Sequence, residues 1–257
     1  MSNTALITGA SSGIGRELAR HHAALGGDLI ITARRGDELD ALKAELEAAH
    51  GVNVHAIPLD LGAAGGADDL YAQVQALGVP VDILINNAGF GGQGPFIDRE
   101  LARDLAMIGL NVVALVTLCH HIGRDMAARG AGKILNVSST AAYMPGPLQA
   151  TYFATKAYVS SFSQALDEEL RGRGVTVTAL EPGAVATEFM ATADLDGTPL
   201  AKVAASATSV AAYGYKAMQA GRLRAINDGR LRFVLNWIFP LLPRRAMLRM
   251  VRRMQTK

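Results

Sequence analysis

The 257-residue sequence contains one cysteine, Cys119, few aromatic residues (5%) and a formal net charge of only +2. One cysteine cannot form an internal disulfide, which excludes a disulfide-stapled fold and favours a reducing compartment, the cytoplasm. The N-terminal segment has neither a basic region nor a long apolar run, so we expect no signal peptide. No run of about 18 consecutive apolar residues is present, so we expect no simple membrane span.

The residues that are present indicate a globular chain. Half of them (50%) are hydrophobic and 19% are charged, which excludes a disordered chain and allows a substantial core. Residues 1–221 carry 15 basic and 22 acidic side chains, whereas residues 222–257 carry 10 basic side chains and one acidic side chain. The chain therefore combines an acidic body with a basic C-terminal segment.

Short apolar runs alternate along the chain with helix-length amphipathic segments such as Leu39, Leu42 and Leu46, which stand at helical spacing. A continuous apolar run indicates a strand buried on both faces, as in parallel sheets covered by helices. The alternation predicts an α/β fold, a Rossmann-like doubly wound parallel sheet of about seven strands with helices on both faces. We expect one domain over residues 1–228 and a helical extension over 229–257. The predicted strands are residues 5–7, 28–31, 52–59, 83–85, 133–137, 175–180 and 223–226.

A glycine-rich turn follows the first predicted strand. In an open α/β sheet this turn binds phosphates, because glycine allows close approach and the next helix offers free N–H groups. The spacing is G-x-x-x-G-x-G rather than G-x-G-x-x-G, and a plain tight turn is the alternative interpretation. We predict a dinucleotide site that includes Gly9, Ser11, Ser12, Gly13, Ile14 and Gly15.

Two arginines, Arg34 and Arg35, follow the second predicted strand, where NAD-binding folds carry an acidic residue that binds the ribose. Without a carboxylate to repel it, a 2′-phosphate could be bound by guanidinium groups. The alternative is a pair of solvated arginines at the start of a helix. The position predicts NADP(H) as the cofactor.

Six motifs together resemble the short-chain dehydrogenase/reductase family, and more loosely its broad-specificity carbonyl reductases with an extended C-terminus. They stand in the family's order within residues 4–187: Thr8–Gly15, Asn86–Gly89, Asn111, Asn136–Ser139, Tyr152–Lys156 and Pro182-Gly183.

Tyr152 and Lys156 stand four residues apart, so on a helix they share one face. An adjacent ammonium group lowers the pKa of a phenol, which makes the pair suited to acid–base catalysis. The resemblance implies that Tyr152 is the general acid or base and that Ser139 orients the substrate oxygen. It also implies that Lys156 holds the nicotinamide ribose and that Asn111 belongs to a proton relay behind the lysine.

The resemblance assigns further residues to the cofactor site. Asp60 would bind the adenine, and Thr187 would contact the nicotinamide carboxamide. Asparagine side chains also bond strand ends, so part of the Asn86–Gly89 motif is expected to be structural. The other residues assigned to this site are Leu61, Asn87, Ala88, Gly89, Pro182, Gly183 and Val185.

We expect the substrate pocket to be walled by residues 90–94, 143–145 and 188–207. The apolar residues Phe189, Met190 and Leu195 in the last segment favour a hydrophobic ketone, aldehyde or alcohol. The leading hypothesis is an NADPH-dependent carbonyl reductase. The alternatives are an idle NADPH-binding regulator and a membrane-surface reductase of lipid-like carbonyls. No metal-binding or nucleic-acid-binding motif is present, so we expect neither partner.

The resemblance also implies a homo-oligomer. We expect Leu118, Ile122, Phe162 and Leu166 to be apolar residues available for burial against a second copy.

The C-terminal segment predicts a helix over residues 244–254. Met247, Met250, Val251 and Met254 share one face of it, and arginines lie off that face. Such a helix could dock on the body of the protein or on a second subunit and close the substrate pocket, or it could contact a lipid surface peripherally. The acidic body favours docking.

Overall fold

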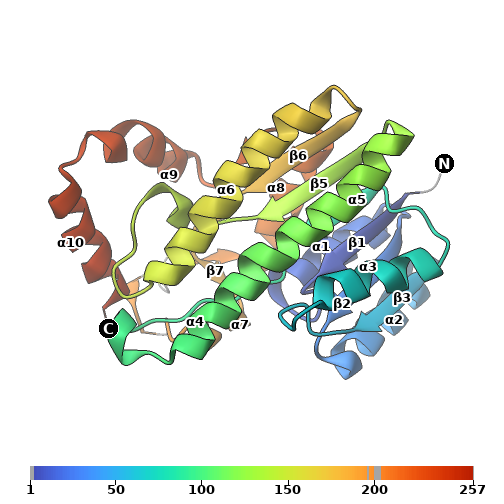
Figure 1. The fold of residues 1–257 in the computed structure, drawn as a ribbon, viewed down its shortest axis with the longest axis horizontal. Coiled ribbons are helices and arrows are strands. Elements are labelled where there is room, and N and C mark those ends of the chain that lie inside the picture. The colour runs from blue at the N-terminus through green and yellow to red at the C-terminus, as the bar shows by residue number, and fades with distance from the viewer. Residues whose placement is uncertain (1–2, 196, 200–203, 257) are drawn as a thin grey trace.

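The computed structural model describes residues 3–195, 197–199 and 204–256. Its centre is a seven-stranded sheet in the order β3-β2-β1-β4-β5-β6-β9, in which every neighbouring pair is parallel (Figure 1). This confirms the predicted doubly wound sheet. The strands are β1 (Thr4–Thr8), β2 (Asp28–Ala33), β3 (Val54–Pro58), β4 (Ile83–Asn86), β5 (Gly132–Val137), β6 (Val175–Leu180) and β9 (Arg224–Ala225). A separate parallel pair joins β7 (Val185–Ala186) to β8 (Ala205–Ser206).

Helices cover both faces of the sheet, which explains why its strands are continuously apolar. One face packs against α1, α2 and α8, and the other against α3, α5 and α6 (Figure 1). Leu39, Leu42 and Leu46 are buried in the first of these layers, as their spacing predicts. The α-helices are α1 (Gly13–Ala24), α2 (Gly36–His50), α3 (Gly66–Ala76), α4 (Leu101–Ile108), α5 (Leu115–Arg129), α6 (Ala150–Arg171), α7 (Glu188–Thr192), α8 (Ala207–Gln219), α9 (Gly229–Phe233) and α10 (Arg244–Gln255).

Short helical turns complete the described elements, and two of them are wide π-helical turns. One of the wide turns, Gly109–Ala114, joins α4 to α5 and was not predicted from the sequence. By length and composition alone, the run Leu101–Arg129 would be apolar enough to cross a membrane. In the fold the second part of this run, α5, is a helix of the core, because Leu118, Ile122 and Met126 are fully buried on the sheet. The short turns are η1 (Phe96–Asp98), η2 (Gly109–Ala114), η3 (Thr140–Tyr143), η5 (Val234–Ile238) and η6 (Phe239–Leu241).

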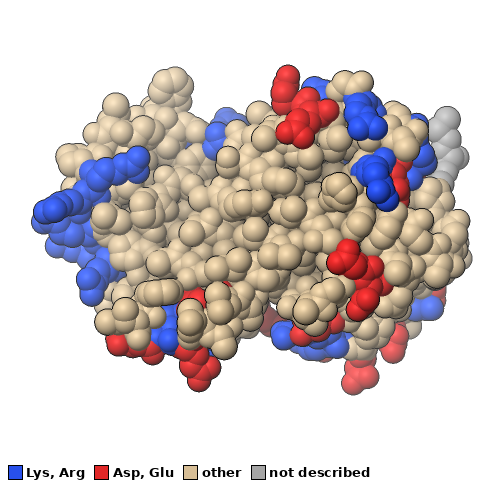
Figure 2. Space-filling model, in the orientation of Figure 1, with Lys and Arg blue, Asp and Glu red and all other residues tan. Residues whose placement is uncertain are grey.

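The C-terminal extension lies beside the carboxyl ends of β5 and β6, away from the N-terminus (Figure 1). The apolar side chains Met247 and Val251 of α10 are buried against Ala141 and Phe153. The expected helix and its docking on the body are therefore confirmed. Met254 on the same face is 39% exposed, and peripheral lipid contact of the extension stays a prediction. The basic residues of α10 form a positive surface on the outside (Figure 2).

Two of the residues predicted to be available to a second copy lie in the core, since Leu118 and Ile122 are each 1% exposed. The prediction is wrong for these two. Phe162 and Leu166 are only partly buried against the same core, so for them it stays a prediction. Other apolar side chains are exposed nearby, on η1, α4 and η2: Phe96, Ile97, Leu101, Leu105, Ile108 and Val113.

Candidate active site

One cavity of about 730 Å³ opens at the carboxyl ends of β1, β4, β5 and β6. It runs from the glycine-rich turn to Tyr152 and on to the C-terminal extension. Of the residues predicted for the site, Gly15 and Asn111 do not line it. The others do: Gly9, Ser11, Ser12, Gly13, Ile14, Arg34, Arg35, Asp60, Leu61, Asn87, Ala88, Gly89, Ser139, Tyr152, Lys156, Pro182, Gly183, Val185 and Thr187.

The glycine turn is held in shape by Asn87, which follows β4. The Asn87 amide donates to the carbonyl oxygens of Thr8 and Gly9, at 3.0 and 3.1 Å. Gly9 has a φ of +67°, and a side-chain carbon at Gly15 would lie 2.4 Å from the Gly9 carbonyl oxygen. Gly15 therefore packs directly against the turn, and only glycine fits at this position. The expected structural role of the asparagine motif is confirmed.

The start of α1 leaves unsatisfied N–H groups beside the cavity. Ser12, its N-cap, makes no side-chain capping hydrogen bond, and the first turn contains no acidic residue. Gly13 and Ile14, in the first turn of α1, line the cavity. A helix end of this kind binds a phosphate through N–H donors and the helix dipole. The local geometry thus fits the pyrophosphate of a dinucleotide.

The two arginines after β2 differ in their contacts. Arg35 donates to Ser11 Oγ at 3.2 Å and forms an ion pair with Glu188 at 2.9 Å. Arg34 is exposed, and it makes no hydrogen bond or ion pair with the residues that the structure describes. Arg34 is therefore the arginine that is available to a ligand without giving up a protein partner.

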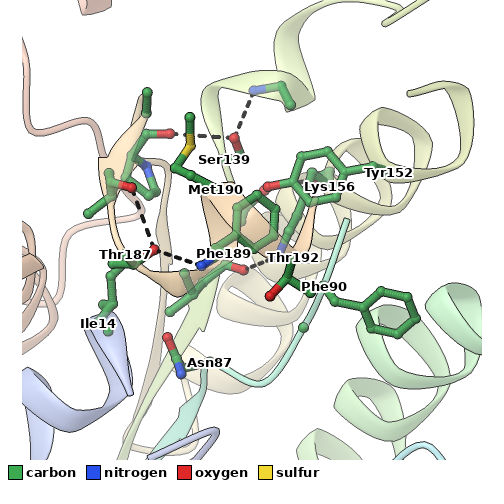
Figure 3. Close-up of a pocket in the computed structure, with 18 of the residues that line it drawn as sticks. Ile14, Asn87, Phe90, Ser139, Tyr152, Lys156, Thr187, Phe189, Met190 and Thr192 are labelled. Carbon is green, nitrogen blue, oxygen red and sulfur yellow. Dashed lines mark hydrogen bonds between the residues drawn. The ribbon is translucent and has the colours of Figure 1, made fainter. Parts of the chain in front are cut away.

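Tyr152, Lys156 and Ser139 face one another across the cavity, with the tyrosine and lysine on α6 and the serine after β5 (Figure 3). Lys156 Nζ lies 5.8 Å from the centre of the Tyr152 ring and donates to the Val137 carbonyl oxygen at 2.8 Å. Ser139 Oγ accepts from the Ala141 N–H at 3.1 Å and donates to the Pro182 carbonyl at 3.4 Å. The three side chains thus occupy defined positions at the end of the sheet.

Burial dominates the electrostatics of this group. It raises the pKa of Tyr152 to about 12, with the Ser139 hydroxyl acting in the opposite direction. It lowers the pKa of Lys156 to about 8. The expected lowering of the tyrosine pKa by the lysine is therefore wrong for this structure. The cause is that desolvation disfavours the phenolate, while the ammonium group bonds Val137 rather than the phenol. Tyr152 is a neutral phenol near neutral pH and can donate a proton.

Asn111 lies in the wide turn η2, outside the cavity, and is 2% exposed. Its side-chain amide makes two hydrogen bonds with the main chain of Phe90. It accepts one from the Phe90 N–H at 3.1 Å and donates one to the Phe90 carbonyl at 3.0 Å. It also donates to Thr155 Oγ1 on α6 at 3.1 Å. Asn111 therefore links the loop after β4 to the helix of Tyr152, and its part in a proton relay stays a prediction.

The substrate end of the cavity is mostly apolar. The segments predicted to form its wall contribute Phe90, Met144, Glu188, Phe189, Met190, Thr192, Leu195 and Ala205. Residues 91–94, Tyr143 and Pro145 do not line it, whereas Asp196 and residues 200–203 of the third segment lie outside the described residues. The docked C-terminal extension closes this end of the pocket, as expected if the apolar face of α10 packs on the body. The extension adds Leu231, Leu235, Phe239, Val251, Met254 and Gln255.

Comparisons with known proteins show which proteins this chain resembles. The sequence model of the short chain dehydrogenase family matches residues 3–196. A short chain dehydrogenase of Pseudocercospora fijiensis (strain CIRAD86) is 38% identical over 74% of this chain, and the match spans 62% of that relative's length.

Two solved structures cover nearly the whole chain. The short-chain dehydrogenase from Sphingobium yanoikuyae in complex with NADPH aligns with a TM-score of 0.84 and 30% identity, over 99% of this chain and 98% of that one. The bulky-bulky ketone specific alcohol dehydrogenase from Comamonas testosteroni aligns with a TM-score of 0.81 and 27% identity, over 99% and 97% of the two chains.

Proposed function

The chain belongs to the short-chain dehydrogenase family and is an NAD(P)-dependent oxidoreductase, and we propose that it reduces a hydrophobic ketone or aldehyde with NADPH. The observation that carries the proposal is the convergence of Ser139, Tyr152 and Lys156 in the cavity that begins at the glycine turn. A regulator that only binds the cofactor has no need of the hydroxyl, phenol and ammonium groups at the far end.

The chain's own residues fit a phosphorylated dinucleotide. The open end of α1 and the turn at Gly9 would hold the pyrophosphate, and Asp60 would hold the adenine. Arg34, which has no carboxylate partner among the described residues, supports a choice of NADP(H) over NAD(H). The structure that aligns with 30% identity contains NADPH, which favours the same choice.

In the proposed reduction, Ser139, Tyr152 and Lys156 each have a separate role. The bound nicotinamide supplies the hydride. Ser139 Oγ donates a hydrogen bond to the substrate carbonyl oxygen and so places it beside the Tyr152 hydroxyl. Tyr152, neutral because burial keeps its pKa near 12, gives its proton to that oxygen as the negative charge develops. Lys156, held by the Val137 carbonyl, provides the positive charge that stabilises the resulting phenolate.

The lining of the cavity supports an apolar substrate of considerable size. Met190 and Leu195 line the cavity together with Leu235 and Val251 of the C-terminal extension. The aligned alcohol dehydrogenase from Comamonas testosteroni is specific for bulky-bulky ketones, which favours the same substrate class here. We propose that residues 229–257 act as the outer wall of the substrate pocket.

Screening of NADPH oxidation against aliphatic, aromatic and steroid-like ketones tests the proposal. We expect turnover with bulky apolar ketones and weaker turnover with carboxylated ones. NADPH binding without turnover of any ketone or aldehyde would favour the regulatory alternative.

We further propose a homo-oligomer that buries the exposed apolar residues of η1, α4 and η2. Leu101 and Leu105 are 61% and 57% exposed on α4, and Val113 is 57% exposed on the next turn. Contiguous apolar surface of this kind is typical of a protein interface. A cytoplasmic location is supported by the single cysteine, which is buried and unpaired.

A further inference from the structure

Glu181 is a buried carboxylate between β6 and Pro182 that the proposed reaction does not use. It is 0% exposed, and a carboxylate in such a place is stable only if its oxygens are bonded. One oxygen accepts from Ser160 Oγ on α6. The other accepts from the Tyr143 hydroxyl at 2.7 Å and from Arg224 Nε at 3.2 Å. The guanidinium of Arg224 also lies over the Tyr143 ring.

Two of the three partners of Glu181, Tyr143 and Ser160, belong to the segments that carry the proposed reacting groups. Tyr143 ends the turn η3, which begins directly after Ser139. The other end of η3 is bonded to Pro182, the residue that follows Glu181. There the Thr140 N–H donates to the Pro182 carbonyl at 2.9 Å. Ser160 stands one turn after Lys156 and two turns after Tyr152 on α6 (Figure 1). Residues 181–182 therefore hold both ends of the serine turn, and Glu181 joins the far end of that turn to α6 through a single carboxylate. At the near end, Ser138 Oγ donates to the Lys156 carbonyl of α6 at 2.8 Å.

We propose that Glu181 is a positioning residue, whose carboxylate fixes the Ser139 turn relative to the helix of Tyr152 and Lys156. This inference rests on the proposed function, because its catalytic consequence is the alignment of Ser139 with Tyr152. Burial raises the pKa of Glu181 to about 7, with the Ser160 hydrogen bond acting in the opposite direction. The donors from η3, α6 and β9 thus keep in place a group that its surroundings would otherwise neutralise.

The same helix and strand supply a matched control. Asp167 of α6 is 3% exposed and is paired with Arg171 at 2.7 Å. It accepts from the Val177 N–H of β6 at 2.7 Å. Asp167 therefore bonds α6 to β6 as Glu181 does, but Asp167 contacts neither η3 nor the cavity. Asp167→Asn measures what the loss of a buried carboxylate costs in stability alone.

The test compares Glu181→Gln, Tyr143→Phe and Asp167→Asn by steady-state kinetics, thermal melting and hydrogen exchange of the peptide covering residues 138–146. Tyr143→Phe removes only the hydrogen bond from the Tyr143 hydroxyl to Glu181. If Glu181→Gln does not fold, Tyr143→Phe still tests the role of Glu181. We expect both site variants to lower kcat for ketone reduction by at least ~10-fold, because small misplacements of reacting groups have large effects. KM and the Kd of NADPH should stay within ~2-fold, and exchange over 138–146 should quicken.

Asp167→Asn should change the melting temperature but neither kcat nor exchange in that peptide. The proposal is overturned if both site variants keep wild-type kcat, or if Asp167→Asn lowers kcat as much as they do. If the wild type reduces no ketone or aldehyde, the proposed function fails. Hydrogen exchange alone then tests whether Glu181 fixes the Ser139 turn to α6. Unchanged exchange over residues 138–146 in Tyr143→Phe would refute that role.

Discussion

Arg35 Nη2 lies 2.9 Å from Glu188 Oε2, so an ion pair joins the end of β2 to the start of α7 beside the cavity. Both side chains are largely exposed, and such a pair adds little stability. The ion pair does, however, neutralise the charge of Arg35. Arg34 has no carboxylate partner among the described residues. Arg34 is therefore the better candidate for the 2′-phosphate of NADPH.

Arg34→Ala should weaken NADPH binding by about 10- to 100-fold, since one charge-assisted hydrogen bond contributes about 1.5–3 kcal/mol. NADH has no 2′-phosphate, so its Kd should barely change. Fluorescence titration of both cofactors measures the two effects, and Arg35→Ala, which also breaks the Glu188 pair, is the comparison. An equal loss for NADPH and NADH would show that Arg34 supports the fold rather than the phosphate.

The titration of Tyr152 gives a prediction about pH. Burial raises its pKa to about 12, and an acid with a raised pKa keeps its proton up to that higher pH. In the protein without cofactor, Tyr152 should therefore contribute no phenolate absorbance below pH ~10, the ordinary value for tyrosine. The difference between wild type and Tyr152→Phe in a near-ultraviolet titration isolates this residue. A Tyr152 phenolate that appears near neutral pH would contradict the electrostatic account.

The packing of α10 predicts that the extension stabilises the fold. Met247 is 2% exposed and Met254 is 39% exposed on the same helix. Met247→Ala should cost about 2–5 kcal/mol of unfolding free energy, whereas Met254→Ala should cost much less. Denaturant unfolding measures both values. A truncation after Gly229 should lower the melting temperature and the turnover of bulky ketones. A truncated protein with unchanged melting and activity would show that the extension does not wall the pocket.

The exposed apolar residues of α4 predict the site of self-association. Leu105→Glu should shift the protein from oligomer to monomer in sedimentation velocity, because a charge would be buried in the contact. Leu25→Glu is a matched control, since Leu25 is 61% exposed beyond the end of α1. A monomeric wild type, or dissociation by both variants, would count against this interface.

The sequence was informative wherever a pattern had one structural solution. The run 175–180 is both the predicted and the observed strand, because a short segment rich in apolar and β-branched residues suits a strand covered on both faces. The apolar face of α10 was visible, but Met247 and Val251 would pack equally well on protein or lipid. Only the position of Phe153 in space decides between them.

Other features depend on contacts between distant residues and leave little local signal. The two-residue strands β7 and β8 pair across 20 positions. The ion pair of Arg35 with Glu188 spans 153 positions. The pKa of Tyr152 was predicted in the wrong direction, because spacing shows the nearby lysine but not the desolvation of the phenol. Glu181 had no sequence pattern of its own, and its role follows from three partners on separate elements.

Transfer of deuterium from NADPH that carries deuterium at both C4 positions to a bulky apolar ketone is the most direct test of the proposed activity. The wild type should form one alcohol per NADPH oxidised, with the label on the carbinol carbon. Tyr152→Phe should bind NADPH within a few-fold of wild type and lose ~10²–10⁴-fold in turnover, the range for a missing general acid. Absence of label in the alcohol, or near-wild-type turnover in Tyr152→Phe, would contradict hydride transfer assisted by Tyr152.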